Sequence, residues 1–581
     1  MALVEARDYS FRYLHGKEPA LKNITLDIQA GTVVGVVGKA GAGKSTFLKA
    51  LMGIVPHIEP GYMEGDLTVA GKPIRDNDVS EMSRHVSIVL ETPEVQIFSL
   101  TVKDDIAFGP ANLGLPREEI WDRVRYAIQE SELQGFEDRN PNNLSGGEQQ
   151  SLALAGALAM RPKLLAMDEP VSMLDPLGKE RVMGIMQRVA KSGGATTVIS
   201  ESGADIEAIA EKVDRVVALH EGRILLDGGP ETLADPRMDE IGVGRPQVSE
   251  LFDRLRQSGV KVDSIPTTLP AAEEAVRRLL GDRRVRAVTI PGDYRNGRSQ
   301  RSFGEVIVDV EDLRHVYPPD IQALRGVTFQ IRSGEIIGVI GQNGSGKTTM
   351  ARHLVGLLKP TGKTSRVTVL GHDVTRLKMR DIIRKINYVF QNADDQIFAN
   401  TIREEVAFAP EMMELPKAEA DALVEEALRA FHLDGHEQDY TLSLPEDLKT
   451  YLSIASIYPL KPQILLIDEP TTGLDTHGER MMMDSLCRLR DAGHTLVIIT
   501  HNMKTVAQYC NRALVMSKGQ IVMDGEVREI YGQPERLLQA DIRPPQITRL
   551  GQDLKDLGLP QDVLTVEEMA RVLTFNLRNE G

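Results

Sequence analysis

The feature that most constrains this chain is a glycine-rich loop that occurs twice. GKAGAGKST covers residues 38–46, and GQNGSGKTT covers residues 341–349. Each copy fits the pattern G-x-x-x-x-G-K-S/T and follows a short β-branched run, TVVGVVG or EIIGVIG. In such a loop the backbone N–H groups and the start of the next helix surround phosphate oxygens, and the lysine neutralises them. Two copies, each after an apolar strand, predict two nucleotide-binding α/β domains with mostly parallel sheets.

The repetition extends over nearly the whole chain. The loop lysines, Lys44 and Lys347, lie 303 residues apart (347 − 44). Similar offsets relate segments that begin at Val95 and Asp395, at Leu164 and Leu465, and at Arg245 and Arg543. We therefore expect two domains of one plan, each with a C-terminal extension.

The expected boundaries follow from this duplication. We expect a first nucleotide-binding domain over residues 1–235, its extension and a linker over 236–303, a second domain over 304–540 and its extension over 541–581. The segment that starts at Gly281 is rich in Arg, Gly and Ser, with weak hydrophobic periodicity. This composition is typical of an exposed linker.

Composition excludes several classes of protein. A net charge of −16 argues against a chain that coats nucleic acid, because phosphate binding needs a concentrated basic surface. The two cysteines, Cys487 and Cys510, form no C-x-x-C pair, which indicates neither a disulfide framework nor a cysteine metal site and fits a reducing cytosol. No run approaches the roughly 18–20 apolar residues that cross a bilayer, so we expect any membrane role to be peripheral.

Two acidic pairs end hydrophobic strands. Asp168–Glu169 and Asp468–Glu469 follow their loop lysines by 124 and 121 residues (168 − 44 and 468 − 347). Each aspartate suits a contact to Mg²⁺ beside a loop hydroxyl, and each glutamate is placed to orient and deprotonate an attacking water. The predicted Mg²⁺ ligands are Ser45, Asp168, Thr348 and Asp468.

LSGGEQQ, residues 144–150, resembles the signature sequence of ATP-binding-cassette (ABC) proteins. In this family the signature helix contacts the γ-phosphate that the opposite domain holds, so the resemblance implies an ATP sandwich formed within one chain. It also implies adenine stacking on an aromatic residue, a Q-loop glutamine at Gln391, a switch histidine at His501, and D-loops that end at Asp175 and Asp475. The implied ATP contacts are Tyr13, Gly38, Gly41, Gly43, Lys44, Ser45, Thr46, Ser145, Gly146, Gly147, Glu148, Tyr317, Gly341, Asn343, Gly344, Gly346, Lys347, Thr348 and Thr349.

The halves diverge at positions that matter to this scheme. LSLPEDLK, residues 442–449, is aligned with LSGGEQQS, so that Leu444 and Pro445 replace the two glycines. Glu91 stands at the Q-loop position of the first half, and Ser202 aligns with His501. In a head-to-tail sandwich every departure falls in one composite site. We therefore expect one hydrolytic site, with Glu469, His501 and Gln391, and one degenerate site that includes Glu169.

The segments around QIFSLTVKDDIAFGP and QIFANTIREEVAFAP resemble the ATPases of energy-coupling-factor importers and their cobalt and nickel relatives. This resemblance implies ATP and Mg²⁺ as cofactors and a place on the cytoplasmic face of the membrane. The implied partners are a transmembrane coupling subunit, docked near Glu94 and Asp394–Asp395, and an integral-membrane substrate-binding subunit for a vitamin or metal ion. A fused sugar-importer ATPase, an exporter ATPase, and a soluble tandem cassette acting on ribosomes or DNA stay open as alternatives.

Overall fold

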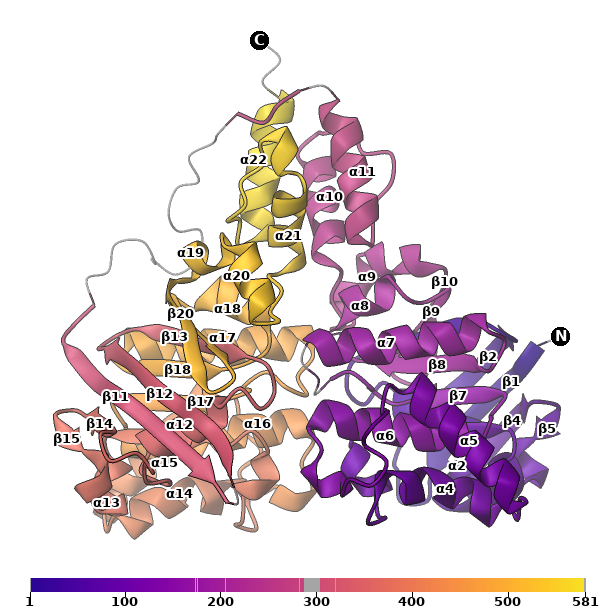
Figure 1. Ribbon diagram of the computed structural model, residues 1–581, viewed down its shortest axis with the longest axis horizontal. Coiled ribbons are helices and arrows are strands. Elements are labelled where there is room, and N and C mark those ends of the chain that lie inside the picture. The colour runs from indigo at the N-terminus through magenta and orange to yellow at the C-terminus, as the bar shows by residue number, and fades with distance from the viewer. Residues whose placement is uncertain are drawn as a thin grey trace. The chain divides into compact units, whose positions relative to one another are not determined.

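The computed structural model describes residues 2–172, 174, 176–203, 205–281, 283–286, 303–318 and 320–578. The chain divides into two compact units, Met1–Arg278 (unit 1) and Leu279–Gly581 (unit 2). Both units contain the same succession of sheets and helices (Figure 1). Most of the expected linker after Gly281 lies outside the described residues, and so does Asp175 of the first expected D-loop.

The core of unit 1 is a six-stranded sheet in which every neighbouring pair is parallel except β9 and β10. Its central strands are buried along their whole length, as expected for β-branched runs covered on both faces. In order across the sheet the strands are β10 (Arg223–Gly228), β9 (Arg215–His220), β3 (Val33–Val37), β8 (Thr196–Glu201), β7 (Leu164–Met167) and β6 (Val86–Val89).

Two hydrophobic clusters cover the two faces of this sheet. Val34 and Val36 of β3 belong to one cluster, whereas Val33 and Val37 belong to the other, as the two-residue period of a strand requires. The first cluster packs against α1 (Lys44–Met52) and an antiparallel sheet, and the second packs against the longer helices. The antiparallel sheet has the order β2 (Leu21–Gln29), β1 (Ala2–Tyr13), β4 (Gly61–Val69), β5 (Lys72–Pro73).

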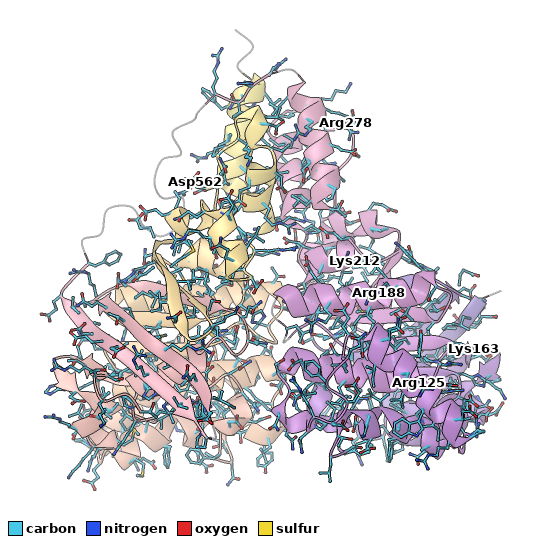
Figure 2. All side chains as sticks on the ribbon, viewed as in Figure 1. Arg125, Lys163, Arg188, Lys212, Arg278 and Asp562 are labelled. Atoms are coloured by element: carbon cyan, nitrogen blue, oxygen red, sulfur yellow. The ribbon has the colours of Figure 1, made fainter. Side chains whose placement is uncertain are left out.

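The helices of unit 1 form a helical layer followed by a C-terminal extension. The layer consists of α4 (Val102–Asn112), α5 (Arg117–Glu130) and α6 (Gly146–Ala159), with α7 (Pro176–Lys191) beside the core sheet. Arg188, labelled in Figure 2, projects from α7 and donates to the carbonyl of Glu130 at 3.2 Å. The remaining helices are α2 (Ile54–His57), α3 (Val79–Met82), α8 (Ile206–Ala210), α9 (Arg237–Glu240), α10 (Gln247–Gln257) and α11 (Leu269–Leu280).

Unit 2 repeats this plan. Its core sheet has the order β16 (Ile386–Val389), β17 (Ile464–Asp468), β18 (Thr495–Ile499), β13 (Ile336–Gly341), β19 (Arg512–Ser517), β20 (Gln520–Glu526). Its antiparallel sheet has the order β12 (Ile321–Arg332), β11 (Val306–Tyr317), β14 (Arg366–Val369), β15 (His372–Asp373). Its principal helices are α12 (Lys347–Leu354), α14 (Ile402–Met412), α15 (Lys417–Ala430), α16 (Glu446–Ala455) and α17 (Thr476–Asp491).

Arg528 links the C-terminal extension of unit 2 to the core. Arg528 donates to Glu568 at 2.6 Å and to the carbonyl of Asp562, labelled in Figure 2, at 2.9 Å. Glu568 also accepts the backbone N–H of Leu564, so the carboxylate ties two segments of the extension to the core. The remaining α-helices of unit 2 are α13 (Met379–Ile382), α18 (Met503–Tyr509), α19 (Val527–Tyr531), α20 (Pro534–Gln539), α21 (Gln546–Asp553) and α22 (Val566–Arg578).

The middle parts of the two units align with one constant offset. Val86 pairs with Leu164 in unit 1, and Ile386 pairs with Ile464 in unit 2, so both strands of each pair differ by 300 residues. The helix that starts at Val102 likewise matches the helix that starts at Ile402. Segments between these strands can therefore be compared position by position. No helix within the described ranges is both long enough and apolar enough to span a bilayer.

Candidate functional site

Both phosphate loops are pressed against the antiparallel sheet of their unit. Gly43 and Gly346 each have φ of 104°, a backbone region that side chains rarely adopt. A Cβ at Gly43 would lie 2.6 Å from the carbonyl oxygen of Ala20, and one at Gly346 would lie 2.7 Å from that of Ala323. These positions therefore require glycine for conformation and for space.

Each loop lysine begins a helix and folds back over its own loop. In unit 2, Lys347 Nζ donates to the carbonyl of Gly341 at 2.7 Å and to that of Gln342 at 2.9 Å. In unit 1, Lys44 Nζ donates to the carbonyl of Gly38 at 2.7 Å and lies 3.3 Å from Glu169 Oε1. The ammonium groups are thus held inside the loops, where terminal phosphates of a nucleotide would lie.

In unit 2 the structure brings together the two groups predicted to bind Mg²⁺. Thr348 Oγ1 donates to Asp468 Oδ2 at 3.0 Å, and the Tyr388 hydroxyl donates to the same oxygen at 2.7 Å. Burial raises the pKa of Asp468 to about 6, although these hydrogen bonds oppose the rise. A hydroxyl beside a carboxylate supplies the oxygen ligands that Mg²⁺ prefers, so the residues fit this ion.

Glu469 follows directly and is held at both oxygens. Oε1 accepts the backbone N–H of His501 at 3.0 Å and lies 2.8 Å from its Nδ1, while Oε2 accepts from Thr500 Oγ1 at 2.9 Å. Its backbone is left-handed, with φ of 52°. Burial acts to raise the pKa of Glu469, but the charge and hydrogen bond of His501, together with the charge of Lys347 and the hydrogen bond of Thr500, outweigh burial and lower that pKa. The group is therefore ionised and fixed in direction, as a base requires.

Unit 1 holds its equivalent acids differently. Ser200 Oγ donates to Asp168 Oδ1 at 2.6 Å and accepts the backbone N–H of Glu169 at 2.9 Å. Ser202, at the position of His501, donates to Glu169 Oε2 at 2.9 Å. The serine that replaces the histidine thus still contacts the glutamate, but it has no imidazole with which to reach a phosphate.

Sequence reasoning missed a third acid in unit 1. Glu201 stands at the position of Thr500 and is only 1% exposed. Its Oε1 accepts the backbone N–H groups of Gly203 and Asp205, and its Oε2 is buried with no hydrogen-bond partner among the described residues. Burial, followed by the charges of Asp205 and Glu169, raises its pKa to about 8. The sequence offered one signal for this acid: TTVISES has a glutamate where the corresponding segment of unit 2, TLVIITH, has a threonine.

The signature residues of unit 1 form a local group at the start of α6. Ser145 caps the helix in a capping box, in which its hydroxyl lies 2.8 Å from Glu148 Oε2 and its N–H donates to the same oxygen at 2.7 Å. Gly146 and Gly147 form the first two helical positions and have no neighbouring atom closer than 3.9 Å to an added Cβ. The helix start is therefore open, as an approach by phosphate would require.

The structure corrects the alignment of the second signature segment. Leu144 and Leu444 are both buried in the core just before their helices, and Pro445 occupies the cap position of Ser145. The prediction that Leu444 and Pro445 replace the glycines is therefore wrong by two residues. That prediction aligns the Leu-Ser pairs of the two segments, whereas burial of Leu144 and Leu444 sets the register. The residues at the glycine positions are Glu446 and Asp447.

The other predicted site residues include two tyrosines, the two Q-loop positions and three residues of the glycine-rich loops. Tyr13 and Tyr317 place their hydroxyls 3.1 Å from Thr46 Oγ1 and 3.4 Å from Thr349 Oγ1, at the start of the loop helices. Glu91 and Gln391 are exposed just beyond the ends of β6 and β16. Asn343 is exposed within its loop, and the glycines at Gly41 and Gly344 both have φ of 75°.

A groove in unit 2 lies beside Phe390 and Gln396. It has a volume of about 240 Å³, and it is lined largely by apolar side chains between β16, α13 and α14. Phe398 and Phe408 meet edge to face at 4.5 Å between ring centroids, and Phe98 and Phe108 of unit 1 repeat this contact at 4.4 Å. Among the lining residues are Leu357, Met379, Phe390, Phe398 and Phe408.

One expected docking residue has a partner within unit 2. Asp394 lies 2.8 Å from Lys449 Nζ, and the same ammonium lies 3.2 Å from Glu446. Lys449 therefore joins the segment after Gln391 to the start of α16.

Known proteins resemble this chain over both units. The family model described as ABC transporter matches residues 21–172 and 324–472. An ABC transporter ATP-binding protein of Caldanaerobacter subterraneus is 37% identical over 97% of both chains. Another, of Methanosarcina acetivorans, is 34% identical over 98% of this chain and 93% of its own. A solved structure, cbiO1 from Clostridium perfringens, part of the ABC transporter complex cbiONQ, is 30% identical over 42% of this chain and 99% of its own, with a TM-score of 0.38.

Proposed function

Because the chain belongs to the ABC transporter family of ATP-binding proteins, we propose that it supplies ATP hydrolysis to a membrane importer of the energy-coupling-factor type. The chain is an ATPase of two cassettes. The importer would carry a vitamin or a transition-metal ion, and the chain would lie at the cytoplasmic face of the membrane. The observation that supports hydrolysis in unit 2 is the fixed, ionised carboxylate of Glu469 beside His501.

The residues of unit 2 have distinct roles in this proposal. Lys347 would bind terminal phosphate oxygens, and Thr348 with Asp468 would hold Mg²⁺. The bound ion would supply positive charge that offsets the negative charge developing during phosphoryl transfer. Glu469 orients a water and accepts its proton while the water oxygen attacks the γ-phosphorus. The bond from that phosphorus to the bridging oxygen breaks, leaving ADP and phosphate.

The family resemblance assigns the two signature helices to opposite nucleotides. In that arrangement the nucleotide of unit 2 meets Ser145, Gly146 and Gly147, all suited to an anion. The nucleotide of unit 1 meets Pro445 and the carboxylates of Glu446 and Asp447, which would repel a triphosphate. Together with Ser202 and Glu91, these residues make the unit 1 site the degenerate one, which holds nucleotide and turns it over slowly or not at all.

The groove of unit 2 supports the proposal of membrane partners. The exposed pair Phe398 and Phe408 in this groove offers an apolar seat to a short helix of a transmembrane coupling subunit. Phe98 and Phe108 offer a related seat in unit 1. An integral-membrane substrate-binding subunit would complete the importer. Identification of the membrane proteins that co-purify with the chain separates this assembly from a sugar importer, which would bring two conventional permeases.

The proposal that ATP is hydrolysed mainly at the unit 2 site is tested in the assembled complex with one glutamate-to-glutamine substitution in each unit. Glu469→Gln should nearly abolish steady-state ATP hydrolysis, because the amide cannot accept the proton of the water. Glu169→Gln, the matched change in unit 1, should leave most of the activity. Equal losses in both variants would contradict the assignment of hydrolysis to unit 2.

A further inference from the structure

The two units secure their metal-site aspartates from opposite sides. Asp468 ends β17, which lies between β16 and β18. Asp168 directly follows β7, which lies between the equivalent strands β6 and β8. In unit 2 the flanking strand that supplies a hydroxyl to the aspartate is β16, whereas in unit 1 it is β8. The same hydrogen bond is thus delivered by different strands.

The exchange is reciprocal at the level of single residues. The offset of 300 that the strand pairing gives makes Ile88 the residue of unit 1 that corresponds to Tyr388 of unit 2. The position of Ser200 is Ile499 in unit 2, since Thr197 and Leu496 occupy equivalent registers beside β3 and β13. At these two positions each unit therefore has one hydroxyl residue and one isoleucine.

We propose, on the basis of the Mg²⁺-dependent ATP binding proposed above, that Tyr388 and Ser200 are positioning residues for the aspartates that hold Mg²⁺. Tyr388 is 7% exposed and Asp468 is 3% exposed, so neither side chain is oriented by bulk water. A buried carboxylate needs hydrogen-bond donors both to offset its desolvation and to fix its direction. One donor on either flanking strand meets this need.

Thr348 explains why a second donor is required. Its hydroxyl shares Asp468 Oδ2 with Tyr388, but the same hydroxyl is a proposed ligand of Mg²⁺. When Thr348 turns to the ion, Tyr388 keeps Asp468 in place. In unit 1, Ser200 also accepts the N–H of Glu169 at 2.9 Å, so one hydroxyl positions both acids of that unit. Unit 1 thereby retains Mg²⁺-dependent nucleotide binding despite its other substitutions.

The test measures binding of a fluorescent ATP analogue during titration with Mg²⁺, with no need for turnover. Lys44→Ala weakens binding of the analogue to the unit 1 loop, so that the measured binding comes from unit 2. Lys347→Ala weakens binding to the unit 2 loop, so that the measured binding comes from unit 1. With unit 2 reporting, Tyr388→Phe should raise the Mg²⁺ concentration at half-maximal binding about tenfold, the effect of one hydrogen bond to a charged group. Ser200→Ala should leave it unchanged. With unit 1 reporting, the two effects should exchange.

Three controls make the outcome specific. Within each lysine-to-alanine background, affinity for the analogue in EDTA should be the same with and without the second substitution, which excludes a general loss of folding. Tyr458→Phe removes a hydroxyl that donates to Glu426 at 2.9 Å elsewhere in unit 2, and it should not move the Mg²⁺ midpoint. Ser200→Thr keeps a hydroxyl and should keep the wild-type midpoint in unit 1.

Two failures are distinguishable. If the unsubstituted chain binds the analogue with no dependence on Mg²⁺, the proposed function itself is wrong. If that dependence is present but Tyr388→Phe and Ser200→Ala show no exchange between the two backgrounds, only the positioning roles are overturned.

Discussion

The imidazole of His501 lies 2.8 Å from the carboxylate of Glu469, and its own backbone N–H donates to the same oxygen at 3.0 Å. One residue thus fixes one carboxylate oxygen twice. In unit 1 the equivalent position carries Ser202, which reaches the other oxygen of Glu169 through its hydroxyl.

Removal of the histidine should therefore affect turnover far more than removal of the serine. His501→Ala leaves the backbone N–H and the Thr500 hydroxyl on Glu469 but removes the imidazole from its carboxylate, and we expect steady-state ATP hydrolysis to fall about 10²-fold. Ser202→Ala is the matched truncation in unit 1 and should leave the rate within about twofold. Comparable losses in the two variants would contradict a single hydrolytic site.

The buried Glu201 predicts a pH-dependent stability of unit 1. Its folded pKa is about 8 and its ordinary value is 4.5, so between these pH values the unfolded chain loses a proton that the folded chain keeps. The free energy of unfolding therefore falls as pH rises through this window. Glu201→Gln retains an acceptor for Gly203 and Asp205 but cannot ionise. Its melting temperature should exceed that of the parent by about 5 °C or more at pH 8.

At pH 4 the melting temperatures of Glu201→Gln and its parent should converge, because Glu201 is then protonated in both folded and unfolded chains. Glu211→Gln changes an exposed glutamate nearby and should show no such trend. An advantage of Glu201→Gln that is equal at all pH values would refute the role of ionisation.

The start of α16 offers a gain-of-function test. A triple substitution, Pro445→Ser, Glu446→Gly and Asp447→Gly, gives α16 of unit 2 the Ser-Gly-Gly start that α6 has in unit 1. It also removes two carboxylates from the first turn of α16. In the Lys347→Ala background we expect the remaining loop to bind ATP about tenfold more tightly, with a smaller gain at high salt, because screening weakens the original repulsion. In the Lys44→Ala background the triple change should have no effect. An unchanged affinity in the first background would count against the composite site.

The apolar groove of unit 2 predicts a separable loss of partner binding. Phe398 is 62% exposed, so Phe398→Asp should leave the core intact while it places a charge in the proposed seat. We expect the membrane subunits to be lost on affinity purification from solubilised membranes, with ATP binding retained. Leu538→Asp changes an apolar residue on α20 that is 54% exposed, and this variant should retain the membrane subunits. Retention of the subunits by Phe398→Asp would place their docking elsewhere.

The sequence predicted the fold class and the positions of the strongest motifs, because these depend on local patterns. The lysine after each glycine-rich loop begins a helix, and the aspartates at Asp168 and Asp468 stand where buried strands end. Contacts between strands distant in the sequence were not predictable. Nothing local indicates that Tyr388 reaches Asp468, 80 residues away. The two-residue error in the alignment at Pro445 arises because the prediction aligns identical residues, whereas burial of Leu444 determines the register.

The close approach of Gly43 to Ala20, repeated by Gly346 and Ala323, has a mechanical consequence. A side chain at either glycine would force the loop away from the antiparallel sheet that carries Tyr13 in unit 1 and Tyr317 in unit 2. In the proposed function that sheet contacts the base and the loop holds the phosphates, so the two glycines set how closely the two ends of a nucleotide site approach each other.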